Sequence, residues 1–209
     1  MYLNIGSGNM GIDQPFAKDP WVNVDINYDE TNEGWKNGKY LKFDLIGTWP
    51  IEENSVDCIF ASHIFEHIEY ISLRGMFKEC YRVLKAGSPI RIICPDPRVF
   101  LSNWRLKNKA FLLNCYGQDY YDRFKYEANP NIAFTDMFFS DHFDHSLISS
   151  IDVLAVNLVR AGFSKVNEMN YGNTEFPKYF GSLSFDVFES TGNTLDNRPV
   201  MSYYLEAVK

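Results

Sequence analysis

The 209-residue sequence contains no run of about 18 apolar residues, the length that a helix needs to cross a bilayer. Its first residues also lack the basic stretch and apolar core of a secretory signal. We therefore expect no membrane segment. A net charge of −7 leaves few basic side chains for phosphate contacts, which argues against DNA binding and disfavours RNA. The one basic cluster, at residues 105–109, is expected to lie on a solvated helix face.

Cysteine is scarce, with four residues and no C-x-x-C pair. Cys58 and Cys94 fall inside apolar, strand-like runs, and Cys80 lies on the apolar face of an expected helix. This pattern predicts buried free thiols in a reducing, cytoplasmic environment.

Aromatic residues are plentiful instead, at 16% of the chain, and twelve of them lie between Pro97 and His145. They form either a pocket wall or a second hydrophobic cluster, and the sequence leaves both alternatives open. The length suits a single domain spanning residues 1–209. Within it, segments 97–145 and 171–200 are longer than ordinary connections, and we expect them to cover the substrate.

Apolar patterning alternates between strands and helices along the chain. Expected strands cover residues 2–5, 22–26, 40–43, 56–61, 89–95, 164–169 and 201–208, and amphipathic helices cover 72–85 and 147–159. Gly87 and Gly162 are placed to end the two helices. The alternation predicts an α/β fold, an open and mostly parallel sheet with helices on both faces.

The stretch Gly6 to Gly11 satisfies G-x-G-x-x-G, the dinucleotide-binding fingerprint. Only ten residues separate Gly11 from the next strand at Val22, and two of them are prolines. The helix that would receive a pyrophosphate is therefore short or missing, which argues against NAD. Asp25 ends that next strand, where a carboxylate can accept hydrogen bonds from both ribose hydroxyls of any adenosine-bearing ligand.

Five stretches in order resemble the class I S-adenosylmethionine-dependent methyltransferases, and most closely the compact type 11 branch found among glycan-biosynthesis proteins. They read LNIGSGN, WVNVDI, FDLIGTWPIEENSVDCIFASHIFEHI, ECYRVLKAGSPIRIICPD and, at the end, AGFSKV with MSYYLEAVK. The resemblance implies a Rossmann-like, doubly wound sheet of seven strands with a last antiparallel strand, to which the aromatic-rich segments are insertions.

The resemblance also implies cofactor contacts, which follow the ends of the strands. Backbone at the glycine loop would pass close to the methionyl part, the carboxylate after the second strand would hold the ribose, and the acid after the third would meet the adenine amino group. The implied cofactor-binding residues are Asn4, Gly6, Ser7, Gly8, Asp25, Ile26, Asp44, Leu45, Ser62 and His63. Asn4 departs from the family, since many relatives carry an acid there that helps to hold the cofactor's amino group.

Four side chains are candidates for a general base: His63, Asp96, His142 and His145. Imidazole suits this role because it titrates near neutral pH. The stretch HIFEH also fits H-x-x-E-H, a zinc-protease pattern, but no third ligand lies nearby and we expect no metal. For His142 and His145, a place beside a helix cap explains their position equally well.

These patterns predict S-adenosylmethionine-dependent O-methylation of a sugar, glycan or other small-molecule hydroxyl. Two alternatives stay open. An NAD-dependent oxidoreductase would need the missing helix, and a catalytically inactive scaffold that kept the cofactor fold would account for Asn4 and for the undefined base.

Overall fold

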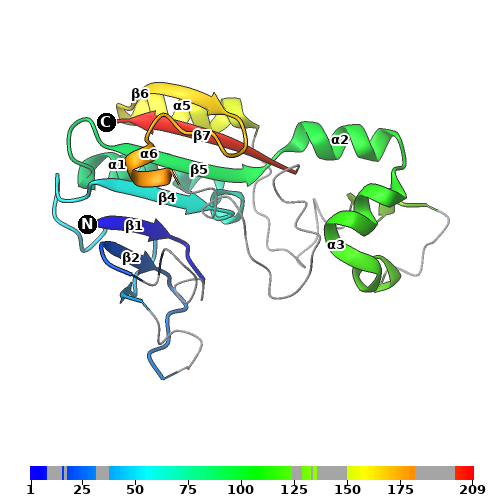
Figure 1. The fold of residues 1–209 in the computed structure, drawn as a ribbon, viewed down its shortest axis with the longest axis horizontal. Helices are drawn as coiled ribbons and strands as arrows, with labels where there is room; N and C mark the ends of the chain where they lie inside the picture. The colour runs from blue at the N-terminus through cyan, green and yellow to red at the C-terminus, as the bar shows by residue number, and fades with distance from the viewer. Residues whose placement is uncertain are drawn as a thin grey trace.

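The computed structural model describes residues 1–8, 16, 18–31, 38–123, 129–132, 134–135, 150–181 and 201–209. At its centre lies a seven-stranded sheet with the order β3-β2-β1-β4-β5-β7-β6 (Figure 1). The strands are β1 (Tyr2–Ile5), β2 (Trp21–Val24), β3 (Tyr40–Leu41), β4 (Cys58–Ser62), β5 (Pro89–Pro95), β6 (Ser164–Met169) and β7 (Ser202–Val208). β1 to β5 are parallel and β7 is antiparallel to β5 and β6, which confirms the expected topology.

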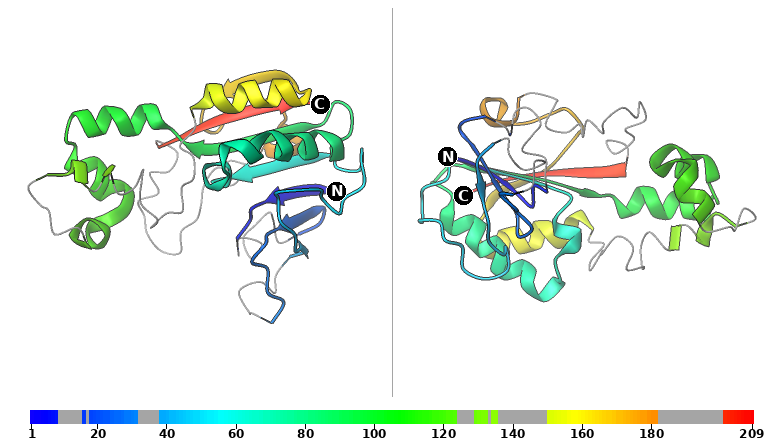
Figure 2. Two further views of the ribbon diagram at one scale, coloured as in Figure 1. Left: turned by 180° about the vertical axis from the view of Figure 1, so that it is seen from behind. Right: turned by 90° about the horizontal axis from the view of Figure 1, so that it is seen from below.

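Helices lie on both faces of the sheet (Figure 2). α1 (Tyr70–Val83) and α5 (Ile151–Ala161) lie together on one face, and the short α6 (Pro177–Phe180) lies on the other. α1 turns a stripe of side chains three and four residues apart into the core, among them Leu73, Phe77 and Cys80. Gly162 ends α5 in the left-handed conformation, as the sequence indicates.

The sheet separates two hydrophobic cores because alternate strand residues point to opposite faces. Ile59 and Ala61 of β4 face the core beneath α1 and α5. Phe60, between them, faces the second core, where it meets Trp21 and Phe180. β4 is buried along its whole length, as expected of a parallel strand covered on both sides.

A buried ion pair joins β5 to β7 on the face that carries α6. Arg91 and Glu206 are paired across the two strands, each is 1% exposed, and an Arg91 Nη1 to Glu206 Oε1 contact of 2.6 Å connects them. Glu206 also accepts hydrogen bonds from the Thr174 hydroxyl and the Glu175 backbone N–H. The pair therefore anchors the segment that leads into α6.

The segment 97–145, for which the apolar pattern predicts no helix, contains two: α2 (Pro97–Arg105) and α3 (Lys109–Arg123). Asp96 caps α2 by accepting a hydrogen bond from the Arg98 backbone N–H, and Pro97 occupies its first turn. The basic cluster at 105–109 lies at the turn between these helices rather than on one helix face. Both helices extend beyond the carboxyl end of β5 (Figure 1).

Three aromatic rings pack against one another beside these helices. Phe111 lies 5.7 Å from Phe100 and 6.0 Å from Phe134, measured between ring centroids. For these three rings, the hydrophobic-cluster alternative is correct. Trp104 is 41% exposed.

The remaining boundaries shift by a few residues. β3 is shorter than the expected 40–43, and α1 begins at Tyr70 rather than at 72. Cys58, Cys80 and Cys94 are free and buried, as predicted. Within the described residues, no helix has the length and apolar character needed to span a membrane.

Candidate functional site

The carboxyl ends of β1, β2, β4 and β5 meet at one edge of the sheet, because these strands are parallel and β1 lies between β2 and β4. Residues 6–8, 25–26, 63 and 96 follow them directly, and Ser62 is the last residue of β4. In open α/β sheets this edge binds ligands. The fold therefore brings residues that lie far apart in the sequence into one candidate site.

The loop after β1 uses glycine for two different reasons. Gly6 has a φ of +63°, and a Cβ atom built on it would lie 2.5 Å from Cγ1 of Ile64. Gly8 has a φ of +52°, but a Cβ there would meet nothing within 4 Å. The first glycine thus lets the loop contact the segment after β4, and the second turns the backbone beside open space.

Asp25 holds this loop to the end of β2. Its Oδ2 accepts a hydrogen bond of 2.7 Å from the Gly8 N–H, and its Oδ1 accepts one of 2.8 Å from the Asn27 N–H. A carboxylate offers about four lone-pair positions, so acceptor capacity for two hydroxyl groups remains. Ile26, the next residue, presents an apolar side chain that is 52% exposed.

Asn4 is buried and bonds to the neighbouring strand. Its Nδ2 donates a hydrogen bond of 2.9 Å to Oδ1 of Asn23, its registered partner on β2. Asn23 in turn donates to the Phe16 carbonyl at 3.0 Å. An acid at position 4 could not donate this bond, so asparagine has a structural explanation here.

Asp44 and Leu45 follow β3. Asp44 is exposed, and its Oδ1 accepts a hydrogen bond of 2.8 Å from the Ile46 N–H. Leu45 is buried, and its carbonyl accepts a hydrogen bond of 3.0 Å from Nε1 of Trp49.

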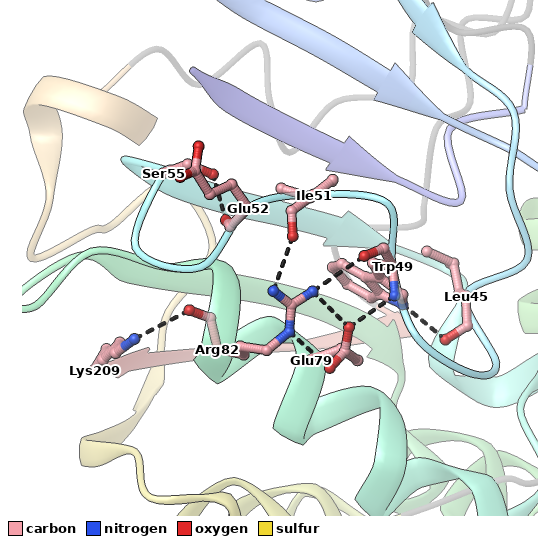
Figure 3. A network of polar contacts seen from close by, with 8 residues as sticks. All are labelled: Leu45, Trp49, Ile51, Glu52, Ser55, Glu79, Arg82 and Lys209. Atoms are coloured by element: carbon pink, nitrogen blue, oxygen red, sulfur yellow. Dashed lines mark hydrogen bonds and ion pairs between the residues drawn. The ribbon is translucent and has the colours of Figure 1, made fainter.

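A charged network holds this segment against α1 (Figure 3). Arg82 donates to the Trp49 and Ile51 carbonyls at 3.1 and 2.8 Å, and its Nη2 lies 2.8 Å from Oε2 of Glu79. Glu79 Oε2 also accepts the Trp49 N–H at 2.7 Å. The hydrogen bond from Arg82 is the main reason why the pKa of Glu79 lies below its usual value. The network fixes the backbone on which Asp44 and Leu45 are placed.

His63 follows β4 with a φ of +53°, and its N–H donates to the Ile93 carbonyl at 2.9 Å. Its imidazole lies between two polar groups: Nδ1 is 3.0 Å from Oε1 of Glu66, and Nε2 is 3.3 Å from Oγ of Ser202. The hydroxyl of the preceding residue, Ser62, is buried and has no hydrogen-bond partner within the described ranges of the chain. Left-handed backbone is uncommon outside glycine and clusters at functional sites.

Asp96 lies at the same edge, but its carboxylate is fully engaged. Both of its oxygens accept hydrogen bonds from the Arg98 guanidinium at 2.8–3.0 Å, and Oδ1 also caps α2. Arg98 extends the pair to Glu168 on β6. A base role for Asp96 would require these bonds to break.

His142 and His145 lie outside the described residues, as does the stretch from Asn9 to Pro15 in which the sequence predicts a short or missing helix. In the described part of the chain, no group of three or more His, Cys, Asp or Glu side chains is placed to hold a metal ion.

Two site residues were missed. In the sequence, Glu66 belongs to the H-x-x-E-H metal pattern, but its spacing from His63 also permits a direct contact within one helical turn. Ser202 carried no local signal because it reaches His63 from 139 positions away, through the antiparallel strand β7.

Comparisons with known proteins agree with this geometry. A family model described as a methyltransferase domain matches residues 3–92. That range runs from β1, through the glycine loop and the turn after β4, into β5. No curated protein matches the chain significantly.

Solved structures share the fold at low sequence identity. An S-adenosylmethionine-dependent methyltransferase from Archaeoglobus fulgidus has a TM-score of 0.60 and 18% identity, over 100% of this chain and 85% of that chain. A methyltransferase from Thermotoga maritima, titled a possible histamine N-methyltransferase, has a TM-score of 0.55 and 14% identity, over 100% of this chain and 81% of that chain. Phosphoethanolamine N-methyltransferase 2 of Haemonchus contortus, in complex with S-adenosyl-L-methionine, has a TM-score of 0.55 and 14% identity, over 100% of this chain and 48% of that chain.

The family match covers the ends of β1, β2 and β4 and stops within β5, and the fold agrees along the whole chain. The chain therefore has the fold of the S-adenosylmethionine-dependent methyltransferases, and its residues 3–92 match the methyltransferase-domain model.

Proposed function

We propose that the protein transfers the methyl group of S-adenosylmethionine to a hydroxyl of a sugar, a glycan or another small molecule. One observation carries the proposal: the imidazole of His63 contacts the buried carboxylate of Glu66 beside the glycine loop. The next residue after His63, Ile64, is the one against which Gly6 packs. Sugar hydroxyls are weak nucleophiles and gain from a general base at the reaction centre. His63 is the base in this proposal.

The cofactor-binding residues in this proposal are those that follow the strands. Asp25 accepts hydrogen bonds from the ribose hydroxyls. It uses the lone pairs of its carboxylate that do not accept from the Gly8 and Asn27 N–H groups. Ile26 and Leu45 contact the adenine ring, and the carboxylate of Asp44 accepts a hydrogen bond from the adenine amino group. Gly6, Ser7 and Gly8 line the methionyl part, and Asn4, Ser62 and His63 border it.

When bound, S-adenosylmethionine supplies a methyl group that is already electrophilic. The chain's residues therefore chiefly align the acceptor, exclude water and remove a proton. His63 is the first choice for the last role because Asp96 is engaged by Arg98. His142 and His145 remain candidates.

The segments 97–145 and 171–200 cover the acceptor in this proposal, within a single domain. α2 and α3 extend from the carboxyl edge of the sheet, the side on which the acceptor must approach (Figure 1). The acidic charge of the chain favours a neutral or cationic acceptor over RNA.

Transfer of a tritiated methyl group tests the proposal, with panels of sugars, small phenols and RNA as acceptors. We expect label on a sugar or another small hydroxyl compound, and loss of transfer in Asp25→Ala. Asp29→Ala is the matched control, because Asp29 is an exposed acid four residues away whose carboxylate bonds to Thr31. No transfer to any acceptor would favour the inactive scaffold, and transfer to RNA alone would contradict the acceptor class.

A further inference from the structure

Glu66 is a carboxylate placed inside the protein. It lies in the single-turn helix η3 (Phe65–His67) and is only 3% exposed. Its Oε1 meets His63, and its Oε2 is buried with no hydrogen-bond partner among the residues that the structure describes. An incompletely bonded carboxylate in a core is costly, so stability alone does not explain its presence.

The groups around Glu66 leave the imidazole of His63 as its principal partner. Cys94 of β5 lies close by. Burial first, the charge of Glu66 second and a side-chain contact with Glu66 raise the pKa of the Cys94 thiol, so the thiol stays neutral. Burial raises the pKa of Glu66 as well, but the hydrogen bond and charge of His63, with a smaller effect of His67, outweigh it and leave that pKa below its usual value. Glu66 therefore stays ionised.

An ionised carboxylate only accepts hydrogen bonds, so the 3.0 Å contact requires a proton on Nδ1 of His63. In the neutral imidazole, Nε2 then carries the lone pair. The Ser202 hydroxyl, 3.3 Å away, can donate to it. The hydrogen bond of 2.9 Å from the His63 N–H to the Ile93 carbonyl of β5 fixes the backbone from which the ring projects.

We propose that Glu66 is a positioning residue that fixes His63 in the Nδ1–H tautomer, with the basic Nε2 held by Ser202 until an acceptor hydroxyl replaces it. This rests on the proposed O-methyl transfer. In that step the acceptor O–H bond breaks and its proton passes to Nε2. The acceptor oxygen bonds to the methyl carbon, and the electron pair of the broken carbon–sulfur bond stays on sulfur.

The tautomer of His63 can be measured by ¹⁵N NMR of protein labelled in its four histidines, with His63→Gln to assign the signal. Spectra are recorded at increasing pH until the imidazole ¹⁵N signals no longer change. We expect Nδ1–H in the wild type. In Glu66→Met, which has no oxygen to accept from Nδ1–H, we expect a shift toward the Nε2–H form that free histidine favours. Glu69→Gln is the control, since Glu69 is exposed and makes no side-chain bond at the start of α1.

An Nε2–H tautomer in the wild type, or an unchanged tautomer in Glu66→Met, would overturn the proposal. The wild-type spectrum decides the matter even if the variant does not fold. In the methyl-transfer assay, Glu66→Met should lower kcat by about 10²-fold, the lower end of what a general base contributes, with little change in the KM for S-adenosylmethionine. Failure of the proposed function would appear in a different measurement, as the absence of methyl transfer by the wild-type protein.

Discussion

At the scale of single residues, the site is marked by left-handed backbone. Gly6, Gly8 and His63 have φ values of +63°, +52° and +53°, and all three lie where β1 and β4 end. The two glycines were identified from their spacing. The backbone of His63 was not, because its conformation follows from the contact of its N–H with β5, which no local pattern reveals.

Gly6→Ala and Gly8→Ala should differ in their cost. Both substitutions put a side chain on left-handed backbone, which costs about 1 kcal/mol. At Gly6 the new methyl group also overlaps Ile64, so we expect a total loss of about 3 kcal/mol in the free energy of unfolding. Urea denaturation measures both values.

Gly75→Ala is the control for these substitutions. Gly75 lies within α1 with open space around it, and alanine there should stabilise the helix by about 0.5–1 kcal/mol. Equal losses for Gly6→Ala and Gly8→Ala would show that the contact between Gly6 and Ile64 is not tight.

At the scale of elements, α1 supports the segment that carries Asp44 and Leu45. The Arg82–Glu79 pair bonds to Trp49 and Ile51 rather than to the candidate ligand residues themselves (Figure 3). The positions of Asp44 and Leu45 therefore depend on α1, although the sequence pattern of α1 predicts only a helix that packs its apolar face against the core.

Glu79→Gln should weaken the protein in a pH-dependent way. The pKa of Glu79 is depressed in the folded state, so the stabilisation is complete above its ordinary value of 4.5 and is lost as the pH falls through the lower, folded value. At pH 7 we expect a loss of about 1–2 kcal/mol, typical of a charged hydrogen bond. The difference from wild type should shrink toward pH 3 in denaturation curves.

Glu52→Gln is the matched control, because Glu52 belongs to the same loop and is exposed. It should leave stability unchanged at both pH values. A constant deficit of Glu79→Gln from pH 7 to pH 3 would mean that its ionisation does not support the loop.

Elements with a strong apolar period were predictable, and those defined by polar caps were not. β1, β5 and β6 match their expected ranges because each run is bounded by glycine, proline or polar residues. α2 and α3 were missed although Asp96 and Pro97 form a helix-start signal, because aromatic residues obscured the apolar spacing.

At the scale of the whole molecule, the sheet order gathers the site. Asp25 and His63 lie 38 positions apart in the sequence and follow β2 and β4, the two strands that flank β1. The family motifs identified these positions, since parallel strands place their carboxyl ends together. The partners Glu66 and Ser202 depended on the fold of η3 and β7, which the motifs do not specify.

The central claim is that this edge binds an adenosyl thioether rather than a dinucleotide. Isothermal titration of the wild-type protein with S-adenosylhomocysteine and, separately, with NADH tests it most directly. We predict saturable binding of S-adenosylhomocysteine that Asp25→Ala weakens by at least about tenfold, the equivalent of 1.4 kcal/mol, and that Asp29→Ala leaves intact. Binding of NADH with no binding of S-adenosylhomocysteine would contradict the account.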